Sequence, residues 1–302
     1  MELCLAAHLW LKRKGVVGMR EIREGAAQLE RLRQRARLSY GLYGVILLAA
    51  VIMAFLSNIL WAVIIGGAAV LLNLLVCGRD IRTYRRKFRE IKLMNEVQGV
   101  LKGAVISEKP VFPADEIKRD GGFPGQPEKG VVRIGVKGTA GRGTTAEMAD
   151  VSFPVPMDFG GNKRKNIIVS GCYMRFKLEK ESGMYGAVFK KGCSIDAALM
   201  NHYRAMGMQL NLWQDYYVCS LDGKNFLTDK MRGILEEIDR YSGGQEMMFL
   251  NRGSIQVFLK GRYLDAGEPQ YKYVITDRSL EGNYIPELPK IMQLIDEGIK
   301  SV

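Results

Sequence analysis

The stretch of residues 41–77 constrains this chain most, because it contains no Lys, Arg, Asp, Glu or His. As one straight helix it would be about 55 Å long, whereas the hydrocarbon core of a bilayer is about 30 Å thick. Ser57 and Asn58, near its middle, offer a place for the chain to reverse direction. We therefore predict a transmembrane helical hairpin with spans at residues 41–56 and 59–77, each near the lower limit of length for a crossing.

Both flanks of this apolar stretch are basic. Residues 1–40 carry nine Lys or Arg against four Glu, and residues 78–102 carry eight against three acidic residues. Basic residues close to the ends of a span are retained in the cytoplasm. Both termini are therefore expected in the cytoplasm, which requires an even number of spans. The alternative, a single span, would carry one basic cluster across the membrane.

The net charge of +12 is concentrated in these two flanks. Residues 103–302 hold 27 basic and 25 acidic residues, which leaves that part nearly neutral. A nucleic-acid site needs a clustered basic face, and the strongest run here, Lys163-Arg164-Lys165, is typical of a solvated loop. We expect no nucleic-acid partner, and we expect the flanks to attract anionic lipid headgroups.

The sequence divides into five parts by composition. We predict that residues 1–40 form a basic N-terminal helical segment and that residues 78–102 form a basic juxtamembrane helix. These two segments flank the hairpin at 41–77. Residues 103–130 are dense in Pro and Gly and predict a connector without regular structure. Residues 131–302 predict an α+β cytoplasmic domain of mostly antiparallel strands with packed helices.

Within that domain the periodicity alternates between strand and helix. Thr228 is a plausible N-cap for a helix that ends near Gly243-Gly244. In the strand at 167–178, alternation predicts one buried face and one wet face, with Tyr173 and Arg175 on the wet one. We expect strands at 131–136, 151–155, 167–178, 187–190, 208–212 and 216–221, a β-hairpin at 246–259, and helices at 195–206 and 288–299.

The segment Gly135–Thr145 is the part of the sequence that most resembles a phosphate-binding loop. Its glycines have the spacing of a P-loop, but Thr144 stands where the phosphate-binding lysine belongs. Without that charge the motif lacks its main chemical requirement. A flexible turn between two strands is the favoured interpretation.

Candidate reactive residues are few and scattered. His8 and His202 have no Cys, His or carboxylate at metal-ligand spacing, and His202 fits a surface or capping position. Cys172 and Cys193 could act as nucleophiles only if folding brought His202 to one of them. Glu236, Glu237 and Asp239 predict the solvated face of a helix. The five cysteines are odd in number and contain no C-x-x-C pair, so we expect no disulfide framework, and we assign no catalytic, cofactor-binding or metal-binding residue.

The order of short motifs resembles a family of bacterial membrane proteins catalogued as domain of unknown function 3137. The motifs are Leu29-Glu30-Arg31-Leu32-Arg33, Tyr84–Arg89, Phe112–Glu116, Ser170-Gly171, Tyr216-Tyr217-Val218 with Ser220 and Asp222, and Leu227-Thr228. The resemblance implies an address in the bacterial inner membrane with a cytoplasmic domain. It transfers no site residues.

These features favour a non-enzymatic binding or scaffolding protein held at the cytoplasmic face of the membrane. Its expected partners are membrane lipids and either another protein or a second copy of the chain. The alternative is a small-ligand sensor or an enzyme, which would need a deep pocket near Cys172, Cys193 and His202. Transport would need oligomerisation, because two spans whose deepest polar group is Asn73 enclose no pathway.

Overall fold

A computed structural model describes residues 2–56, 59–98, 100–107, 114–126, 129–140, 144–158, 164–178, 184–261, 263–264, 273–276, 280 and 287–299. Within these, the side chains of residues 2–24, 74, 114, 158, 164 and 298–299 are not described. The chain forms two compact units: residues 1–95 with 266–283, and residues 96–265 with 284–302. Each unit is considered separately below.

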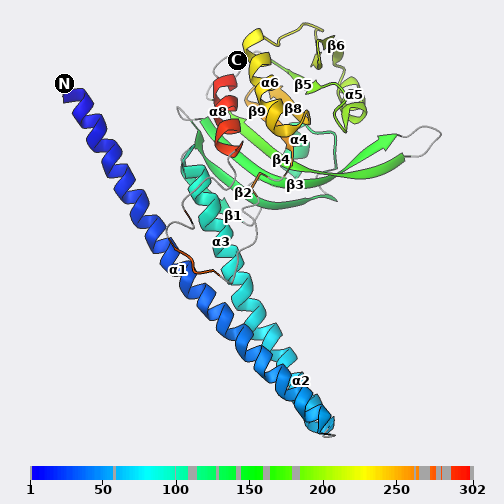
Figure 1. Ribbon diagram of the computed structural model, residues 1–302. Coiled ribbons are helices and arrows are strands. Elements are labelled where there is room, and N and C mark those ends of the chain that lie inside the picture. Colours follow the sequence, from blue (N-terminus) through cyan, green and yellow to red (C-terminus); the bar gives the residue numbers. More distant parts are fainter. Residues whose placement is uncertain are drawn as a thin grey trace. The chain divides into compact units, whose positions relative to one another are not determined.

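The first unit is a pair of long helices (Figure 1). Helix α1 (Glu2–Phe55) continues from the N-terminal segment to the end of the first apolar stretch, and α2 (Ile59–Leu72) returns beside it. The helical prediction for both stretches is confirmed, although the expected turn at Ser57-Asn58 lies outside the described residues. Helix α2 continues without a break through a short π-helix, η1 (Asn73–Cys77), into α3 (Gly78–Gln98).

Small residues form much of the contact between α1 and α2. Ala50 and Ala69 are buried, and Ala62 and Gly66 are half-buried, whereas Ala54 is exposed. Small side chains allow two helix backbones to approach closely. The sequence could not show the π-helix, in which the wider turn places Cys77 against α1: its thiol donates to the Ser39 carbonyl at 3.2 Å.

Polar contacts hold the two helices together beyond the apolar part. Asp80 accepts hydrogen bonds from Arg35 Nε at 3.2 Å and from Ser39 Oγ at 2.9 Å. Further along, Tyr84 and Phe88 of α3 pack with Ala26 and Leu29 of α1. The pairing of α1 with the α2–α3 helix therefore extends past residues 41–77 into both basic flanks.

The second unit is built on a nine-stranded antiparallel sheet with the order β1-β2-β3-β4-β9-β8-β5-β7-β6. Its α+β class was predicted. The strands are β1 (Leu101–Ser107), β2 (Val131–Ala140), β3 (Thr144–Asp158), β4 (Arg164–Lys177), β5 (Gly186–Lys190), β6 (Gln209–Trp213), β7 (Tyr216–Ser220), β8 (Glu246–Asn251) and β9 (Ser254–Lys260).

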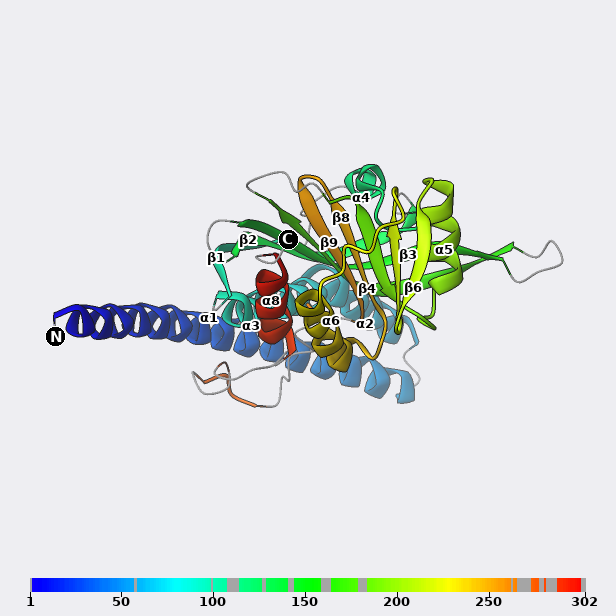
Figure 2. The same ribbon diagram turned by 90° about the horizontal axis from the view of Figure 1, so that it is seen from above.

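Helices cover both faces of this sheet (Figure 2). Helices α4 (Ala114–Asp120) and α5 (Asp196–Ala205) lie on one face, where Ile117, Leu199 and Tyr203 join the main apolar core. Helices α6 (Asp229–Ser242) and α8 (Glu287–Ile299) lie on the other face and pack against each other. Burial on both faces explains why strands in the middle of the sheet carry consecutive apolar residues, such as Met247–Leu250 in β8 and Val257–Leu259 in β9.

Several elements agree with the sequence prediction in detail. Thr228 caps α6, its hydroxyl accepting from Met231 N at 3.2 Å, and Gly243 ends the helix in the left-handed conformation. Strands β8 and β9 form the predicted hairpin. Strand β2 extends to Ala140 rather than to residue 136, and β3 covers Thr144–Asp158 rather than residues 151–155. The additional residues lack a clear alternation of apolar and polar side chains.

The prediction that residues 103–130 form no regular structure is wrong. Residues 101–107 form edge strand β1, which pairs with β2, and residues 114–120 form α4. The juxtamembrane helix accordingly ends at Gln98 rather than at residue 102. Apart from Gly103 in β1, the prolines and glycines of residues 103–130 lie outside these two elements, either between them or after α4. The positive φ of Gly103, 63°, falls where the β1–β2 register shifts.

Candidate functional site

The apolar surface of the hairpin is the first candidate. Two helical stretches of the described residues, Gly25–Phe55 and Ile59–Gln98, are long and apolar enough to cross a membrane, and only 6% of the most apolar part of each is buried. The core helix of a soluble protein would be mostly buried. Exposed apolar patches of this extent mark contact with a membrane or another protein. Among the described residues of 41–77, the most exposed large side chains are Phe55, Leu56, Ile59, Leu60, Val63 and Leu75.

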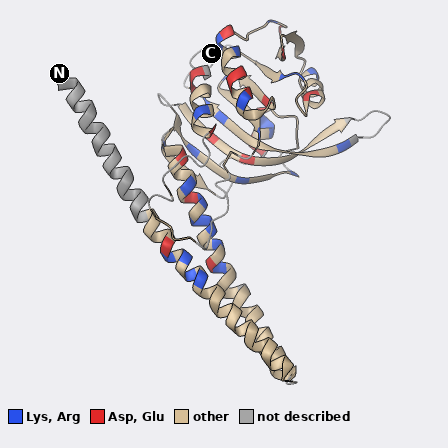
Figure 3. Cartoon of the chain, in the orientation of Figure 1, with Lys and Arg blue, Asp and Glu red and all other residues tan. Residues whose placement is uncertain are grey.

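Basic residues follow the apolar stretch on both helices (Figure 3), and several of them are exposed arginines. We call these arginines the basic collar; it consists of Arg31, Arg35 and Arg37 on α1 and Arg79, Arg82, Arg85 and Arg86 on α3. Asp80 is buried between the two helices at this level and binds Arg35 across them. It is one negative charge among seven arginines, so the exposed surface stays positive. The collar presents guanidinium groups that bind phosphate oxygens well.

A row of polar side chains crosses the sheet of the second unit and forms the other candidate. Lys137 of β2 pairs with Glu147 of β3, Glu147 pairs with Arg175 of β4, and Arg175 pairs with Gln256 of β9. Directly paired residues in a sheet point to the same face. Arg175 lies two positions after Tyr173 in β4, so both side chains point to the same face of the sheet. Because Tyr173 belongs to the core under α4 and α5, the whole row lies on that face.

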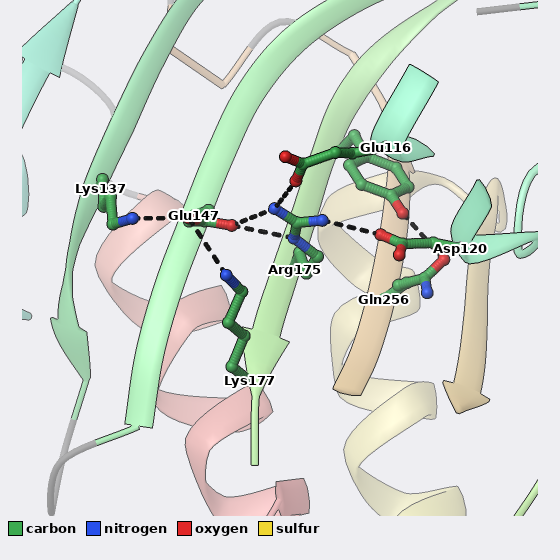
Figure 4. Close-up of polar contacts among 8 residues, drawn as sticks. Glu116, Asp120, Lys137, Glu147, Arg175, Lys177 and Gln256 are labelled. Atoms are coloured by element: carbon green, nitrogen blue, oxygen red, sulfur yellow. Dashed lines mark hydrogen bonds and ion pairs between the residues drawn. The ribbon is translucent and has the colours of Figure 1, made fainter. Parts of the chain in front are cut away.

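Arg175 binds three carboxylates from two elements (Figure 4). Its Nε and Nη2 donate to Glu147 Oε2 at 2.9 and 2.5 Å. Its Nη1 donates to Asp120 Oδ2 at 2.9 Å, and Nη2 also reaches Glu116 Oε2 at 2.6 Å. Glu116 and Asp120 are four residues apart on α4 and therefore share one side of that helix. We call these residues, with Lys137 and Lys177, the Arg175 centre.

The charges of the Arg175 centre balance. Three carboxylates face three cations, since Lys137 Nζ lies 2.9 Å and Lys177 Nζ 3.9 Å from Glu147 Oε1. Burial acts to raise the pKa of Glu147, but hydrogen bonds from Lys137 and Arg175 outweigh it, and the pKa lies below its usual value. Burial likewise opposes the charge of Arg175, while bonds to Glu116, Glu147 and Asp120 raise its pKa.

The expectation of a wet face for Tyr173 and Arg175 is wrong. Arg175 is only 5% exposed and Glu147 only 2%. The cause is α4, which covers this face and could not be predicted from a segment rich in Pro and Gly. The sequence did offer one signal, the spacing of Glu116 and Asp120, which places two carboxylates on one side of a helix. It did not show that they bind an arginine of a strand.

The segment after α4 is pinned to the same face. Tyr203 Oη of α5 donates to the Gly122 carbonyl at 2.7 Å, and His202 Nε2 lies 2.7 Å from the Gly121 carbonyl. A Cβ added at Gly122 would lie 2.3 Å from Gln256 Oε1, so glycine is required there by close approach. His202 is thus a half-buried residue that positions this segment, rather than the surface or capping residue expected.

Among the described residues, no hydrogen bond joins His202 to Cys172 or Cys193, the two cysteines considered as nucleophiles; its Nε2 lies 2.7 Å from the Gly121 carbonyl instead. Cys193 belongs to the core under α4 and α5, whereas Cys172 alternates with the core residue Tyr173 and faces the opposite side of the sheet. Burial raises the pKa of Cys193 to about 11 and that of Cys172 well above its usual value. A cavity beside Cys193, lined also by Ser194, Gln245 and Glu246, has a volume of about 10 Å³, which is room for one water molecule.

The glycine-rich segment Gly135–Thr145 is mostly strand. Its first six residues belong to β2 and its last two to β3, and Ala140 pairs directly with Thr144. A β-ladder of this kind directs backbone N–H groups to the neighbouring strand rather than to a phosphate. The expected turn is confined to residues 141–143, which lie outside the described residues, as does Lys163 of the basic run.

Comparisons with known proteins identify no family. No protein-family model matches the sequence, and no curated protein matches it. The resemblance to the family of domain of unknown function 3137 therefore stays a prediction. Among solved structures, the crystal structure of the mycobacterial trehalose monomycolate transport factor A, TtfA, aligns with 68% of this chain and 95% of its own at 11% identity and a TM-score of 0.35. A likeness at that level carries no argument about function.

Proposed function

We propose that this chain is a membrane-anchored, non-enzymatic binding or scaffolding protein of the bacterial inner membrane. In this proposal the α1–α2 hairpin crosses the bilayer twice, and both termini and the α+β unit lie in the cytoplasm. The observation that carries it is the exposure of the hairpin's apolar side chains, of which only 6% are buried in the most apolar part of each helix. In water this surface would cost about 25 cal/mol for every Å² left exposed.

The basic collar supports the same orientation. Arginines on both helices follow the apolar surface on one side only, and basic residues near span ends remain in the cytoplasm. Anionic headgroups of the inner leaflet are the matching partners, at about 1 kcal/mol for each basic residue near the surface. The near-neutral second unit would then meet a protein partner or a second copy of the chain.

The anchoring part of the proposal is tested by placing charge on the apolar surface. V63R puts an arginine at a side chain that is 68% exposed, whereas R37K keeps the charge on the collar and serves as the control. We expect V63R to reduce the fraction of chain that resists alkaline carbonate extraction, because an arginine inside a span is costly, up to about 2.5–3.5 kcal/mol at the span centre. Equal extraction of wild type and V63R would contradict the proposal.

The binding part is tested by crosslinking in intact membranes, followed by identification of the captured proteins. A reproducible protein partner or a specific self-contact through the α+β unit would support it. Capture of lipid alone would contradict it. A variant that removes the collar charges of α3, with Arg79, Arg82, Arg85 and Arg86 changed to Gln, separates lipid contacts from protein contacts.

A further inference from the structure

Glu246 is a buried carboxyl that the proposed function does not use. It is the first residue of β8 and is only 2% exposed. Ser242 Oγ, from the last residue of α6, donates to its Oε2 at 2.6 Å. Within the described part of the chain its other oxygen, Oε1, has no hydrogen-bond partner. An ionised carboxylate left in this state would be costly, whereas the protonated form is neutral and avoids the cost of burying a charge.

The groups around Glu246 provide little compensating positive charge. Strand pairing of Phe189 with Met247 brings Lys190 of β5 alongside Glu246 on the α6 face of the sheet. Lys190, however, is ion-paired with Asp239 of α6. The C-terminal end of α6, which is the negative end of its dipole, is also close. Charged and titratable groups face Glu246 from each element packed around it. They are Asp239 on α6, Lys190 on β5, Tyr216 on β7, Lys260 on β9, Cys193 before α5, and Tyr263.

Two further polar atoms in this cluster lack partners within the described residues. They are Tyr216 Oη and Asp239 Oδ1. Tyr216 pairs directly with Lys190 in the sheet, so Glu246, Lys190 and Tyr216 lie in one row beneath α6. Three buried polar atoms without partners in the described part of the chain therefore gather around the C-terminal part of α6, and each such atom opposes the docking of that part because it has lost its hydrogen bonds to water.

We propose that Glu246 is a proton-binding site that couples the docking of α6 to pH: its carboxyl is protonated while α6 is seated on the sheet and ionises when the C-terminal half of α6 lifts away. Docking then weakens as the pH rises. Burial raises the pKa of Glu246 to about 7; the charge of Asp239 adds to this, while the hydrogen bonds from Ser242 and from its own backbone N–H and the charge of Lys190 oppose it. The transition therefore falls near physiological pH. This inference does not depend on the membrane topology proposed above.

The test is hydrogen exchange of the α6 backbone in the full chain in detergent micelles, measured at pH 6 and pH 8 and corrected for the intrinsic exchange rate. If the pKa of Glu246 is about 4.5 when α6 is lifted and about 7 when α6 is docked, protection against exchange should fall about tenfold between pH 6 and pH 8. E246Q should show no such loss, whereas E236Q, which removes an exposed carboxyl from the same helix, should behave as wild type.

Two more variants predict opposite shifts of the midpoint. S242A removes a hydrogen-bond donor that favours the ionised form of Glu246, so the pH midpoint of the loss of protection should rise. D239N removes a negative charge and releases Lys190, so it should fall. Equal profiles for wild type and E246Q would overturn the proposal. So would infrared or ¹³C NMR titration of wild type showing Glu246 already ionised at pH 6, a measurement that decides the matter even if a variant fails to fold.

Discussion

Replacing Arg175 by methionine tests the energetic role of the Arg175 centre. R175M keeps most of the side-chain volume but removes every hydrogen bond to Glu147, Asp120 and Glu116. Breaking one partner of a buried ion pair costs about 3–5 kcal/mol, because the other charge stays buried without compensation. Glu147 keeps Lys137 at 2.9 Å, and the side chains of Glu116 and Asp120 are 31% and 18% exposed and can be hydrated. We therefore expect a loss near the lower limit, about 3 kcal/mol.

The assay is urea unfolding of the full chain in detergent micelles, followed by tryptophan fluorescence. Trp10 and Trp61 are changed to Phe, so that Trp213 on β6 reports on the sheet alone. K177M is the matched control: Lys177 is half-exposed and 3.9 Å from Glu147, and such a pair contributes less than about 0.5 kcal/mol.

A double-mutant cycle separates the pair from the rest of the site. E147Q removes the charge that R175M would leave buried, so R175M/E147Q should lose at least about 2 kcal/mol less than the sum of the two single variants. If R175M costs under about 1 kcal/mol, or if the two costs simply add, then Arg175 and Glu147 do not act as a coupled pair and α4 is held by apolar contacts alone.

Three further predictions follow from single positions in the second unit. The pKa of Glu147 is lowered on folding, so its contribution to stability is complete above the unfolded value near 4.5 and is lost as the pH falls through the folded value; acid unfolding of E147Q should be less steep than that of wild type, and equal slopes would contradict this. T228A removes the side-chain cap of α6 and should cost about 1 kcal/mol in urea unfolding, with no change in stability as the contrary result. G122A forces a Cβ against Gln256 and Phe249 and should cost about 1–3 kcal/mol, whereas G233A, with nothing within 4 Å of the new Cβ in α6, should stabilise by up to about 1 kcal/mol; equal effects would refute the packing argument.

The parts of the fold that were predictable are those controlled by neighbours in sequence. The helical hairpin follows from the length of the charge-free stretch, and α6 follows from its cap, its apolar spacing and its terminal glycines. The β8–β9 hairpin follows from two short strands around Asn251, Arg252 and Gly253. In each case the residues that decide the structure lie within a few positions of one another.

The candidate site was not predictable, because its residues are distant in sequence. Arg175 reaches Glu147 across 28 positions and Glu116 across 59. Alternation correctly placed Arg175 opposite Met174 and Phe176, but it could not show that α4 covers the second face. Glu246 is similar: as the first residue of a strand it suggests an exposed end, and only the position of α6 above it explains its burial.

Thiol accessibility tests the central claim, which is that the apolar hairpin leaves both basic flanks on the cytoplasmic side. Single cysteines are placed at Leu38 on α1 and Arg82 on α3 in a chain with Cys4 changed to Ser, since Cys77, Cys172, Cys193 and Cys219 are buried. An impermeant maleimide should label both positions in inverted membrane vesicles and neither in intact spheroplasts. Labelling of one position from the outside and the other from the inside would contradict the hairpin and remove the basis for a cytoplasmic α+β unit.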